Sequence, residues 1–539
     1  MPRDASRWRP RTGRAASASR RGSGSMAEQG GPSGGRPEGR GRQRPSGPDR
    51  ARGGARGPRR RSATAPSART RRAEPTRFAA YTLLRGVADG AYANLELPAI
   101  LRRHRLDGRD AAFATELGFG TIRWQGFYDA VIADAAGRPL TRIDPQVLDV
   151  LRLGAHQLLG MRVATHAAAD QTVGLATVVA GAGAGGFVNA VMRRVSERDL
   201  EQWREAVVPP GGGAVSLGVR HSHPEWVVTA LRASLLGHGR ATAATVDAEL
   251  EALLEADNDP PRVHLVARPG LSSVAELVAA ADAEPSALSP LGVVLRGGDP
   301  GAVAAVREGR AAVQDEGSQL LAVALARAEV APGAPARWLD LCAGPGGKAG
   351  VLGALAVEAG ADLTAVEVSP HRAELVRRTL AALGRHADGL GRRIEVRTAD
   401  GRELGEDEPE AYARVLVDAP CTGLGALRRR PEARWRRQPS DVAALAPLQR
   451  ALLASALDAV APGGVIGYAT CSPHIAETRF VVSDVVKRRR DVEVVDAREL
   501  FTDAAGRPVP GLGDGPYVQL WPHVHGTDAM FFALVRKLT

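Results

Sequence analysis

The chain of 539 residues is 44% hydrophobic and contains 71 Lys and Arg against 60 Asp and Glu. This size and composition allow two to four soluble domains with ample cores. No apolar run approaches the roughly 18 residues that span a bilayer, and the N-terminus has no apolar signal-peptide region, which argues against an integral membrane protein and against secretion.

The positive charge is concentrated at the N-terminus. Residues 1–72 contain 20 Arg and four acidic residues, a net charge of +16, whereas the remainder of the chain sums to −5. This segment is rich in Gly, Ser and Pro and has almost no bulky apolar residues, so we expect a disordered basic tail over residues 1–75. Such a tail could tether the protein to a polyanion. Alternatively, the start codon is misassigned, and Met26 is one other candidate start.

From about residue 76 the apolar pattern predicts helices. Ala80, Leu84 and Val87 recur at three- and four-residue spacing, as one buried helix face requires. No strand-like alternation interrupts this period, so we predict an all-helical domain over residues 76–206. The Pro- and Gly-rich loop 207–216 marks its end.

Residues 217–330 predict a small α+β linking module. SHPEWVVTAL opens a helix with Pro224 early in it, where the missing N–H costs little. PRVHLVA (261–267) and GVVLRG (292–297) have the composition of strands.

Between residues 331 and 539, short apolar strands alternate with glycine loops and helices. The candidate strands are ARWLDLC, LTAVEV, RIEVRT, ARVLVDAP, GVIGYATC and FFALVRK. This alternation predicts an α/β domain with a Rossmann-like, mostly parallel sheet that is covered on both faces. Functional residues of such folds collect at the carboxyl ends of the strands.

The segment DLCAGPGGK (340–348) follows the first of these strands and opens a helix. Gly344, Gly346 and Gly347 allow a ligand to approach the backbone, and the helix start presents free N–H groups. The loop alone fits a dinucleotide, a phosphate or S-adenosylmethionine. It is not a P-loop, because Ala349 follows the lysine.

Acidic residues at the next strand ends narrow this choice. Glu367 ends the second strand, where it can accept hydrogen bonds from ribose hydroxyls, and Asp400 ends the third, beside the expected adenine. Asp418 ends the fourth. Each one alone could be a helix cap or a solvated turn, but the series favours a cationic sulfonium cofactor over a pyrophosphate.

Three cysteines occur in the chain. Cys421 in DAPC and Cys471 in YATCSPH each end an apolar strand and are candidate nucleophiles, between which the residues alone do not choose. We expect Cys342 to be a small packing residue. So few cysteines, without CxxC spacing, predict a reducing, cytoplasmic location. The 12 histidines form no ligand-spaced cluster, so we predict no metal site.

Residues 336–539 resemble the catalytic domain of the RNA 5-methylcytosine methyltransferases of the Sun/Fmu family. The matching segments are DLCAGPGGK, AVEVSPHR, TADGRE, LVDAPCTGLGALRRRPE, GYATCSP and DAMFFALVRK. FAAYTLLRGV through FVNAVMRR resembles the NusB-like RNA-binding domain of the bacterial 16S ribosomal RNA branch. SHPEWVV, NDPPRVHLV and QDEGSQLLAVAL are similar to the linking region of that branch.

The resemblance implies an S-adenosylmethionine site. Two departures are small: family members often have Ala where Gly344 stands, and Glu367 replaces a frequent Asp. The implied cofactor-binding residues are Cys342, Ala343, Gly344, Pro345, Gly346, Gly347, Lys348, Glu367, Arg372, Asp400 and Asp418.

The resemblance also assigns the catalytic roles. Carbon 5 of cytosine becomes nucleophilic when a thiolate adds to carbon 6. In DNA enzymes the Pro-Cys thiol attacks, at the position of Cys421. In the resembling family the Thr-Cys-Ser thiol attacks, so Cys471 is the implied nucleophile and Cys421 assists breakdown of the adduct. Asp418 would bind the cytosine N3 and amino edge, and Lys348 would support this carboxylate.

The implied substrate is small-subunit ribosomal RNA before full assembly, and we expect a monomer. The basic strip of Arg428, Arg429 and Arg430 would contact this RNA. Alternatives are methylation of tRNA, a non-catalytic RNA-binding assembly factor and a DNA methyltransferase. An adenine amino-methyltransferase would have another residue at Cys421.

Overall fold

The computed structural model describes residues 74–539. The basic tail expected over residues 1–75 therefore lies almost wholly outside the described residues.

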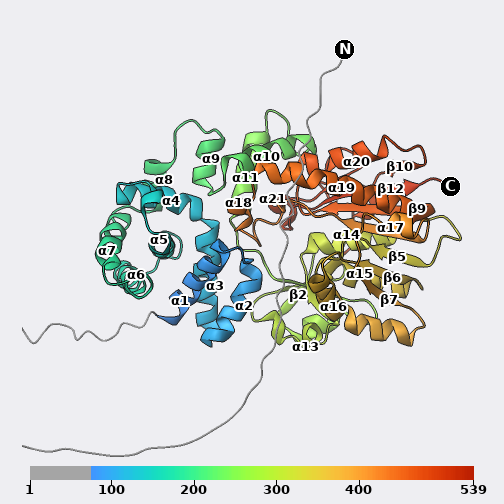
Figure 1. Ribbon diagram of the computed structural model, residues 1–539, viewed down its shortest axis with the longest axis horizontal. Coiled ribbons are helices and arrows are strands. Elements are labelled where there is room, and N and C mark those ends of the chain that lie inside the picture. Colours follow the sequence, from blue (N-terminus) through green and yellow to red (C-terminus); the bar gives the residue numbers. More distant parts are fainter. Residues whose placement is uncertain (1–73) are drawn as a thin grey trace, which may run out of the picture. The chain divides into compact units, whose positions relative to one another are not determined.

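Helices alone make up the described chain from Glu74 to Val208, which confirms the all-helical prediction (Figure 1). The first helix shows how the sequence fixes a helix start: the Glu74 carboxylate accepts the backbone N–H groups of Thr76 and Arg77, and a proline takes the first helical position. The helices are α1 (Pro75–Ala88), α2 (Ala93–His104), α3 (Gly108–Arg123), α4 (Gln125–Ala136), α5 (Pro145–Leu159), α6 (Thr165–Ala180), α7 (Ala184–Val195) and α8 (Leu200–Val207), with a 3-10 turn at Leu140–Arg142.

Six further helices and a four-stranded antiparallel sheet follow. The expected loop 207–216 is shorter than predicted because α9 starts at Ala214, and Pro224 caps α10 from just outside the helix. The helices are α9 (Ala214–Arg220), α10 (Glu225–Gly237), α11 (Val246–Ala256), α12 (Val274–Ala280), α13 (Ala304–Arg307) and α14 (Glu316–Arg327). The sheet has the order β2-β3-β1-β4, with β1 (His264–Ala267), β2 (Ala283–Pro285), β3 (Gly292–Leu295) and β4 (Ala311–Val313).

The sequence predicted β1 and β3 but not β2 and β4. The two missed strands are only three residues long and form the edges of the sheet. So short a segment carries too few alternations to produce a periodic signal.

The C-terminal part contains the predicted α/β sheet, in the order β10-β12-β9-β8-β5-β6-β7, with β11 pairing β12. The five strands from β9 to β7 are parallel, and β12 and β10 run antiparallel at one side. The strands are β5 (Arg337–Asp340), β6 (Asp362–Val366), β7 (Ile394–Arg397), β8 (Tyr412–Asp418), β9 (Val460–Thr470), β10 (Val492–Val495), β11 (Val518–Gln519) and β12 (Phe531–Lys537).

Helices cover both faces of this sheet (Figure 1). Alternate residues of β8 enter different cores: Leu416 packs with α14, α15 and α16, whereas Val415 and Val417 pack with α19 and α20. The helices are α15 (Gly347–Glu358), α16 (Pro370–Gly389), α17 (Leu404–Asp407), α18 (Ala433–Arg436), α19 (Pro439–Ala459), α20 (Arg479–Val486) and α21 (Pro522–His525).

The strand order creates a crevice at the carboxyl ends of β5 and β8. From β5 the chain moves to β6 and β7 on one side, and it then returns to β8 on the other side. Ligands of open α/β sheets bind at such a switch point. The glycine loop after β5 and the Asp418 loop after β8 meet there.

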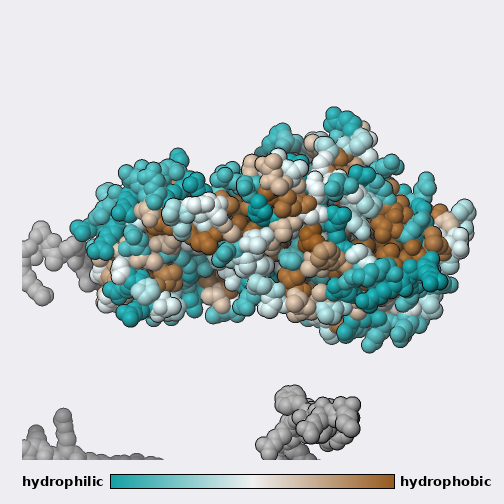
Figure 2. Space-filling model, turned by 90° about the horizontal axis from the view of Figure 1, so that it is seen from above, coloured by the Kyte–Doolittle hydropathy of each residue, from teal (hydrophilic) through white to brown (hydrophobic). Residues whose placement is uncertain are grey.

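One described helix, α19, is long and apolar enough to cross a membrane by length and composition. This corrects the expectation that no apolar run approaches that length; the alanines of α19 keep its mean hydropathy high. The helix contacts β8, β9, α17 and α20, and its buried residues belong to the core. We interpret it as a core helix. On the face drawn in Figure 2, hydrophilic residues gather along the edges.

A buried arginine joins the helical part to the α/β part. Arg434, which has no exposed surface, donates to the backbone oxygens of Arg123, Ser222 and Asp257 and to Oδ1 of Asn258, at 2.6–3.1 Å. Burial lowers its pKa to about 9, and the nearby Asp257 charge opposes this shift.

We predict that Arg434→Ala lowers the free energy of unfolding by about 3–5 kcal/mol, because it leaves the buried Asp257 and several carbonyls without their cation. Urea unfolding followed by tryptophan fluorescence measures this change. The exposed Arg490 is the matched control, and Arg490→Ala should change stability by less than about 0.5 kcal/mol. Equal stability of the two variants would refute the structural role of Arg434.

Candidate active site

The loop between β5 and α15 needs glycine at two positions. Gly344 and Gly346 have φ values of 56° and 94°, in the region that other residues rarely adopt. A Cβ at Gly346 would also come within 3.0 Å of the Thr379 side chain. The N–H of Gly346 donates to Ala343 O, so the loop folds back on itself before the helix starts.

A buried carboxylate lies at the end of β5. Asp340 has no exposed surface, its Oδ1 accepts the backbone N–H of Cys342 at 3.3 Å, and its Oδ2 has no hydrogen-bond partner among the described residues. Burial, reinforced by the negative charge of Asp418, raises its pKa to about 7. The sequence analysis assigned no role to Asp340, although it begins the glycine motif. A cationic ligand would compensate this buried charge.

The acids of the next two strands lie at the strand ends that the sequence predicted: Glu367 directly follows β6, and Asp400 lies in the loop after β7. Glu367 is buried, and it accepts the N–H of Ser369 at 2.9 Å and the guanidinium of Arg372 at 2.5 Å. Asp400 pairs with Arg402 at 2.5 Å. Carboxylate oxygens retain further lone pairs in such arrangements, so both residues can still accept hydrogen bonds from a ligand.

Lys348 and Asp418 form an ion pair of 2.8 Å across the crevice between β5 and β8. Burial alone would lower the pKa of Lys348, but the charge and hydrogen bond of Asp418 outweigh it and raise this pKa. The ammonium group therefore stays charged and orients the carboxylate.

The two candidate nucleophiles are in contact. The Sγ atoms of Cys421 and Cys471 lie 3.4 Å apart, because their strands β8 and β9 are parallel neighbours. The hydrogen bond between them, together with burial, raises the pKa of Cys421 well above its usual range. The same hydrogen bond lowers the pKa of Cys471. By geometry alone either sulfur could donate, and from the opposite pKa directions we infer that Cys421 donates to the Cys471 thiolate.

The third cysteine is separate from this pair. Cys342 is partly buried and packs against the core on the α19 side of the sheet. Burial raises the pKa of its thiol well above the usual range, which leaves it unreactive.

A buried carboxylate that the sequence analysis missed ties the two cysteine loops together. Glu477 accepts the N–H of Thr422 at 2.8 Å, the hydroxyl of Thr422 at 2.5 Å and the hydroxyl of Ser472 at 2.7 Å. These three donors belong to residues next to Cys421 or Cys471, and Gln449 Nε2 of α19 also donates to Glu477, at 3.3 Å. The only sequence signal was an acid six residues after Cys471 in an apolar stretch.

The structure does not present the predicted basic strip as one surface. Arg428 is buried and donates to Gly526 O at 2.6 Å. Arg429 pairs with Asp315 and Asp528 at 2.6 and 3.1 Å. Only Arg430 is exposed, so it alone of the three keeps a guanidinium available to a polyanion.

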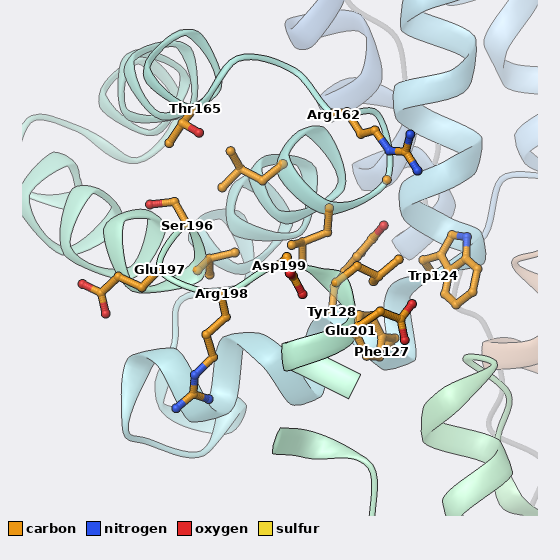
Figure 3. Close-up of a pocket in the computed structure, with 15 residues that line it drawn as sticks. Trp124, Phe127, Tyr128, Arg162, Thr165, Ser196, Glu197, Arg198, Asp199 and Glu201 are labelled. Carbon is orange, nitrogen blue, oxygen red and sulfur yellow. The ribbon is translucent and has the colours of Figure 1, made fainter. Parts of the chain in front are cut away.

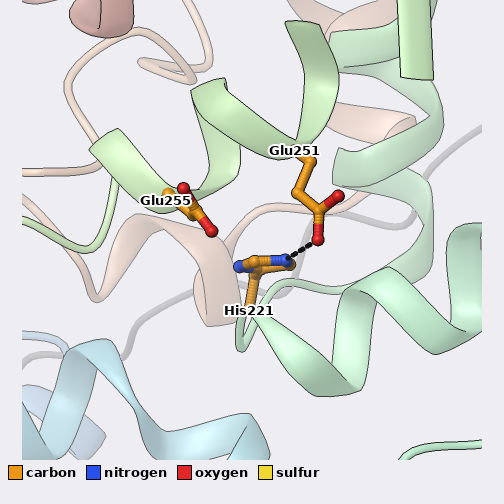
Figure 4. A group of neighbouring side chains, drawn as sticks. All are labelled: His221, Glu251 and Glu255. Carbon is orange, nitrogen blue, oxygen red and sulfur yellow. Dashed lines mark ion pairs between the residues drawn. The ribbon is translucent and has the colours of Figure 1, made fainter. Parts of the chain in front are cut away.

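One group of metal-ligating side chains occurs in the part of the chain that the structure describes. His221 lies between Glu251 and Glu255 of α11, with Nε2 3.5 Å from Glu251 Oε1 (Figure 4). The sequence hid this group because thirty residues separate the histidine from the first glutamate. Both glutamates are exposed, whereas His221 is buried and burial lowers its pKa. We interpret the group as a contact between a neutral imidazole and surface carboxylates.

A cavity in the helical part has no lining residue near the cysteines in the sequence. This cavity of about 630 Å³ is lined by side chains between Trp124 and Glu201, all from the helical part. Figure 3 shows Trp124, Phe127 and Tyr128 on one side and Arg198 on another. No residue of the glycine loop or of the strand ends contributes to it.

Comparison with known proteins identifies both parts of the chain. Residues 328–536 match the family model of the 16S rRNA methyltransferase RsmB/F, and residues 74–197 match that of the NusB family. Rv1407 of Mycobacterium tuberculosis is 50% identical over 477 residues, which cover 87% of this chain and 98% of that protein. Ribosomal RNA small subunit methyltransferase B of Pseudomonas putida is 33% identical over 470 residues, with coverages of 86% and 98%.

A solved structure shares the fold. The crystal structure of PH0851 superposes with a TM-score of 0.69 at 20% sequence identity, and it covers 86% of this chain and 99% of that one.

We predict that Cys421→Ala raises the pKa of Cys471, because the variant loses the hydrogen bond that stabilises the Cys471 thiolate. Iodoacetamide alkylation of Cys471, followed by mass spectrometry across pH, should shift to higher pH. Cys342 is the internal control and should stay unmodified in both proteins. An unchanged alkylation profile would contradict the assigned direction of the hydrogen bond.

Proposed function

Because the chain belongs to the 16S rRNA methyltransferase RsmB/F family, we propose that it methylates carbon 5 of a cytosine in small-subunit ribosomal RNA. The observation that carries this proposal is the 3.4 Å contact between the thiols of Cys421 and Cys471. Nucleophilic addition and later release of a pyrimidine ring need one thiolate and one proton-handling group at the same place.

S-adenosylmethionine is the proposed methyl donor, and the described residues fit it. Positive φ at Gly344 and Gly346 opens the loop to a ligand, α15 presents N–H groups, and the unpartnered Oδ2 of Asp340 suits a cation. When bound, this cofactor supplies an electrophilic methyl group. The proposed binding set is Cys342, Ala343, Gly344, Pro345, Gly346, Gly347, Lys348, Glu367, Arg372, Asp400 and Asp418.

The opposite pKa directions of the two thiols support the roles that the family resemblance implies. The Cys471 thiolate adds to carbon 6 of the cytosine, which makes the ring an enamine that is nucleophilic at carbon 5. After methyl transfer, removal of the carbon 5 proton expels the Cys471 thiolate. Cys421 keeps its proton during the attack, since its pKa is raised. During release it gives that proton to the departing sulfur of Cys471 and accepts the carbon 5 proton in its place. A DNA-type mechanism would require the opposite assignment.

Asp418 and Lys348 act on the base. The carboxylate of Asp418 accepts hydrogen bonds from the amino group and the protonated N3 of the adduct. Lys348 holds that carboxylate in place at 2.8 Å. Because a stacked base cannot reach this crevice, the target cytosine must be flipped out or single-stranded.

We further infer a function for each domain of the chain. Residues 76–206 would bind RNA as a NusB-like domain, residues 217–330 would link, and residues 331–539 would catalyse. The family matches over 74–197 and 328–536 support this division. The proposal places the protein in the cytoplasm, as a monomer acting on RNA before small-subunit assembly is complete.

We predict opposite outcomes for the two cysteines. Cys471→Ala should abolish both turnover and the covalent protein–RNA adduct, because no thiolate remains to attack carbon 6. Cys421→Ala should accumulate a denaturant-resistant adduct, because release is impaired. Denaturing gels with labelled RNA measure both effects, and Ser483→Ala, at an exposed position outside the proposed site, is the control. Normal turnover of Cys421→Ala together with an adduct in Cys471→Ala would reverse the assignment.

The substrate is tested by bisulfite sequencing of total RNA from a deletion strain. The proposal expects one 16S ribosomal RNA cytosine to lose its methyl group and to regain it on complementation. Loss of a mark in tRNA instead would assign the same chemistry to tRNA. No lost mark would favour a non-catalytic assembly role, against which the intact catalytic set argues.

A further inference from the structure

Tyr92, an aromatic residue of the helical part, lies against two arginines of the α/β part. It is 45% exposed and occupies the N-cap position of α2, where its side chain makes no capping hydrogen bond. The guanidinium carbons of Arg430 and Arg436 lie 5.6 and 5.3 Å from the centroid of its ring. Exposed aromatic rings beside exposed guanidinium groups are typical of surfaces that bind single-stranded nucleic acid.

Backbone contacts hold Tyr92 in this place. Arg436 donates to Val87 O at 2.8 Å and also to Ala91 O, and the carboxylate of Glu432 accepts the N–H of Ala93 at 3.3 Å. These bonds join the loop before α2 to residues 432–436 on both sides of Tyr92. The ring is therefore positioned before any ligand arrives, which lowers the entropic cost of binding.

The same arginine segment leads back to the nucleophile. The N–H of Arg430 donates to Ala426 O, and the N–H of the adjacent Gly425 donates to Cys471 O at 2.9 Å. The hydrogen bond from Cys421 is the main cause that lowers the pKa of Cys471, and the positive charge of Arg430 adds to it. Arg430 thus lies within electrostatic reach of the reactive thiol.

Arg430 differs from its neighbours in having a free charge. Arg428 donates a hydrogen bond to Gly526 O, and Arg429 forms ion pairs with two acidic residues. Arg430 is exposed and forms no ion pair with any residue between 74 and 539. A phosphate is the natural partner of such a guanidinium.

We propose that Tyr92 and Arg430 form a subsite for a nucleotide adjacent to the target cytosine, with its base stacked on Tyr92 and its phosphate on Arg430. This inference rests on the proposed function, since its ligand is the substrate RNA. Extruding a cytosine breaks its stacking on its neighbours. Stacking on Tyr92 replaces part of that lost contact and holds the strand open beside Cys471.

The first test measures RNA binding, independently of methyl transfer. Tyr92→Ala should weaken the Kd for a protein-free 16S ribosomal RNA transcript by about 5- to 100-fold, the effect of losing one base–aromatic stack. Tyr92→Phe should retain the wild-type Kd, because it keeps the ring. Leu390→Ala is the control. Leu390 is 57% exposed and lies between α16 and β7, which is an edge strand of the sheet. A wild-type Kd for Tyr92→Ala would overturn the subsite.

The second test separates the phosphate contact from the stack. Arg430→Gln should lower the slope of log K against log[salt] by about 0.7–1, as expected for one lost phosphate contact. Arg490→Gln is the control and should leave the slope unchanged. Arg490 lies just before β10, whose Val492 pairs with Lys537, and Lys537 is at the end of β12 opposite to Phe531, the partner of Thr470. An equal effect of the two substitutions would mean that the charge acts only through the overall field, and would overturn the phosphate contact.

A third readout distinguishes this proposal from a structural role for Tyr92. Ultraviolet crosslinking of the wild-type complex should join the Tyr92 peptide to a nucleotide within a few positions of the methylated cytosine. The affinity of Tyr92→Ala for S-adenosylmethionine should stay within about twofold of wild type. Absence of that crosslink, or loss of cofactor affinity in the variant, would overturn the subsite.

Failure of the subsite and failure of the proposed function give different results. If wild-type protein produces no 5-methylcytosine in any RNA, the proposed function fails, and the Kd series still tests the subsite. If wild-type protein methylates the transcript and Tyr92→Ala keeps both its Kd and its KM for RNA, the function stands and the subsite is refuted.

Discussion

The buried carboxylate of Glu477 is the interaction on which the catalytic arrangement depends. Removing a carboxylate from water is costly unless it accepts several hydrogen bonds. Thr422 and Ser472 provide those bonds from the two different cysteine loops. The need to satisfy one buried charge therefore holds Cys421 and Cys471 in contact, and it limits how far the loops can separate.

The two carboxyl groups of the crevice, those of Asp418 and Asp340, differ in whether they form an ion pair. Lys348 offsets the charge of Asp418 on one side of the crevice. Asp340 forms no ion pair among the described residues, and burial raises its pKa to about 7 although the charge of Lys348 opposes this shift. In a low-dielectric site each charge acts strongly on its neighbours. A cationic ligand would complete this arrangement, whereas an anionic one such as a pyrophosphate would oppose it.

The three parts of the chain meet around the segment after Cys421. Arg434 anchors it to residues of the helical part and of the linking region, and Arg436 fixes the loop that carries Tyr92. Most arginines of this segment serve the fold, which explains how a body with a negative net charge can still offer a local contact to RNA. Binding then depends on the few guanidinium groups that remain exposed, above all that of Arg430.

Local patterns in the sequence determined the fold class, the glycine loop, the order of the acids at the strand ends and the two reactive cysteines. Each of these follows from hydrophobic period or from backbone conformation within a few residues. The tertiary structure alone decided that the thiols of Cys421 and Cys471 lie in contact, that Glu477 joins their loops and that Arg428 and Arg429 are used internally. It also brought Tyr92 to Arg436, whose bonded neighbour Val87 is 349 residues away. These outcomes depend on burial and on electrostatic contacts between distant segments, which no window of sequence contains.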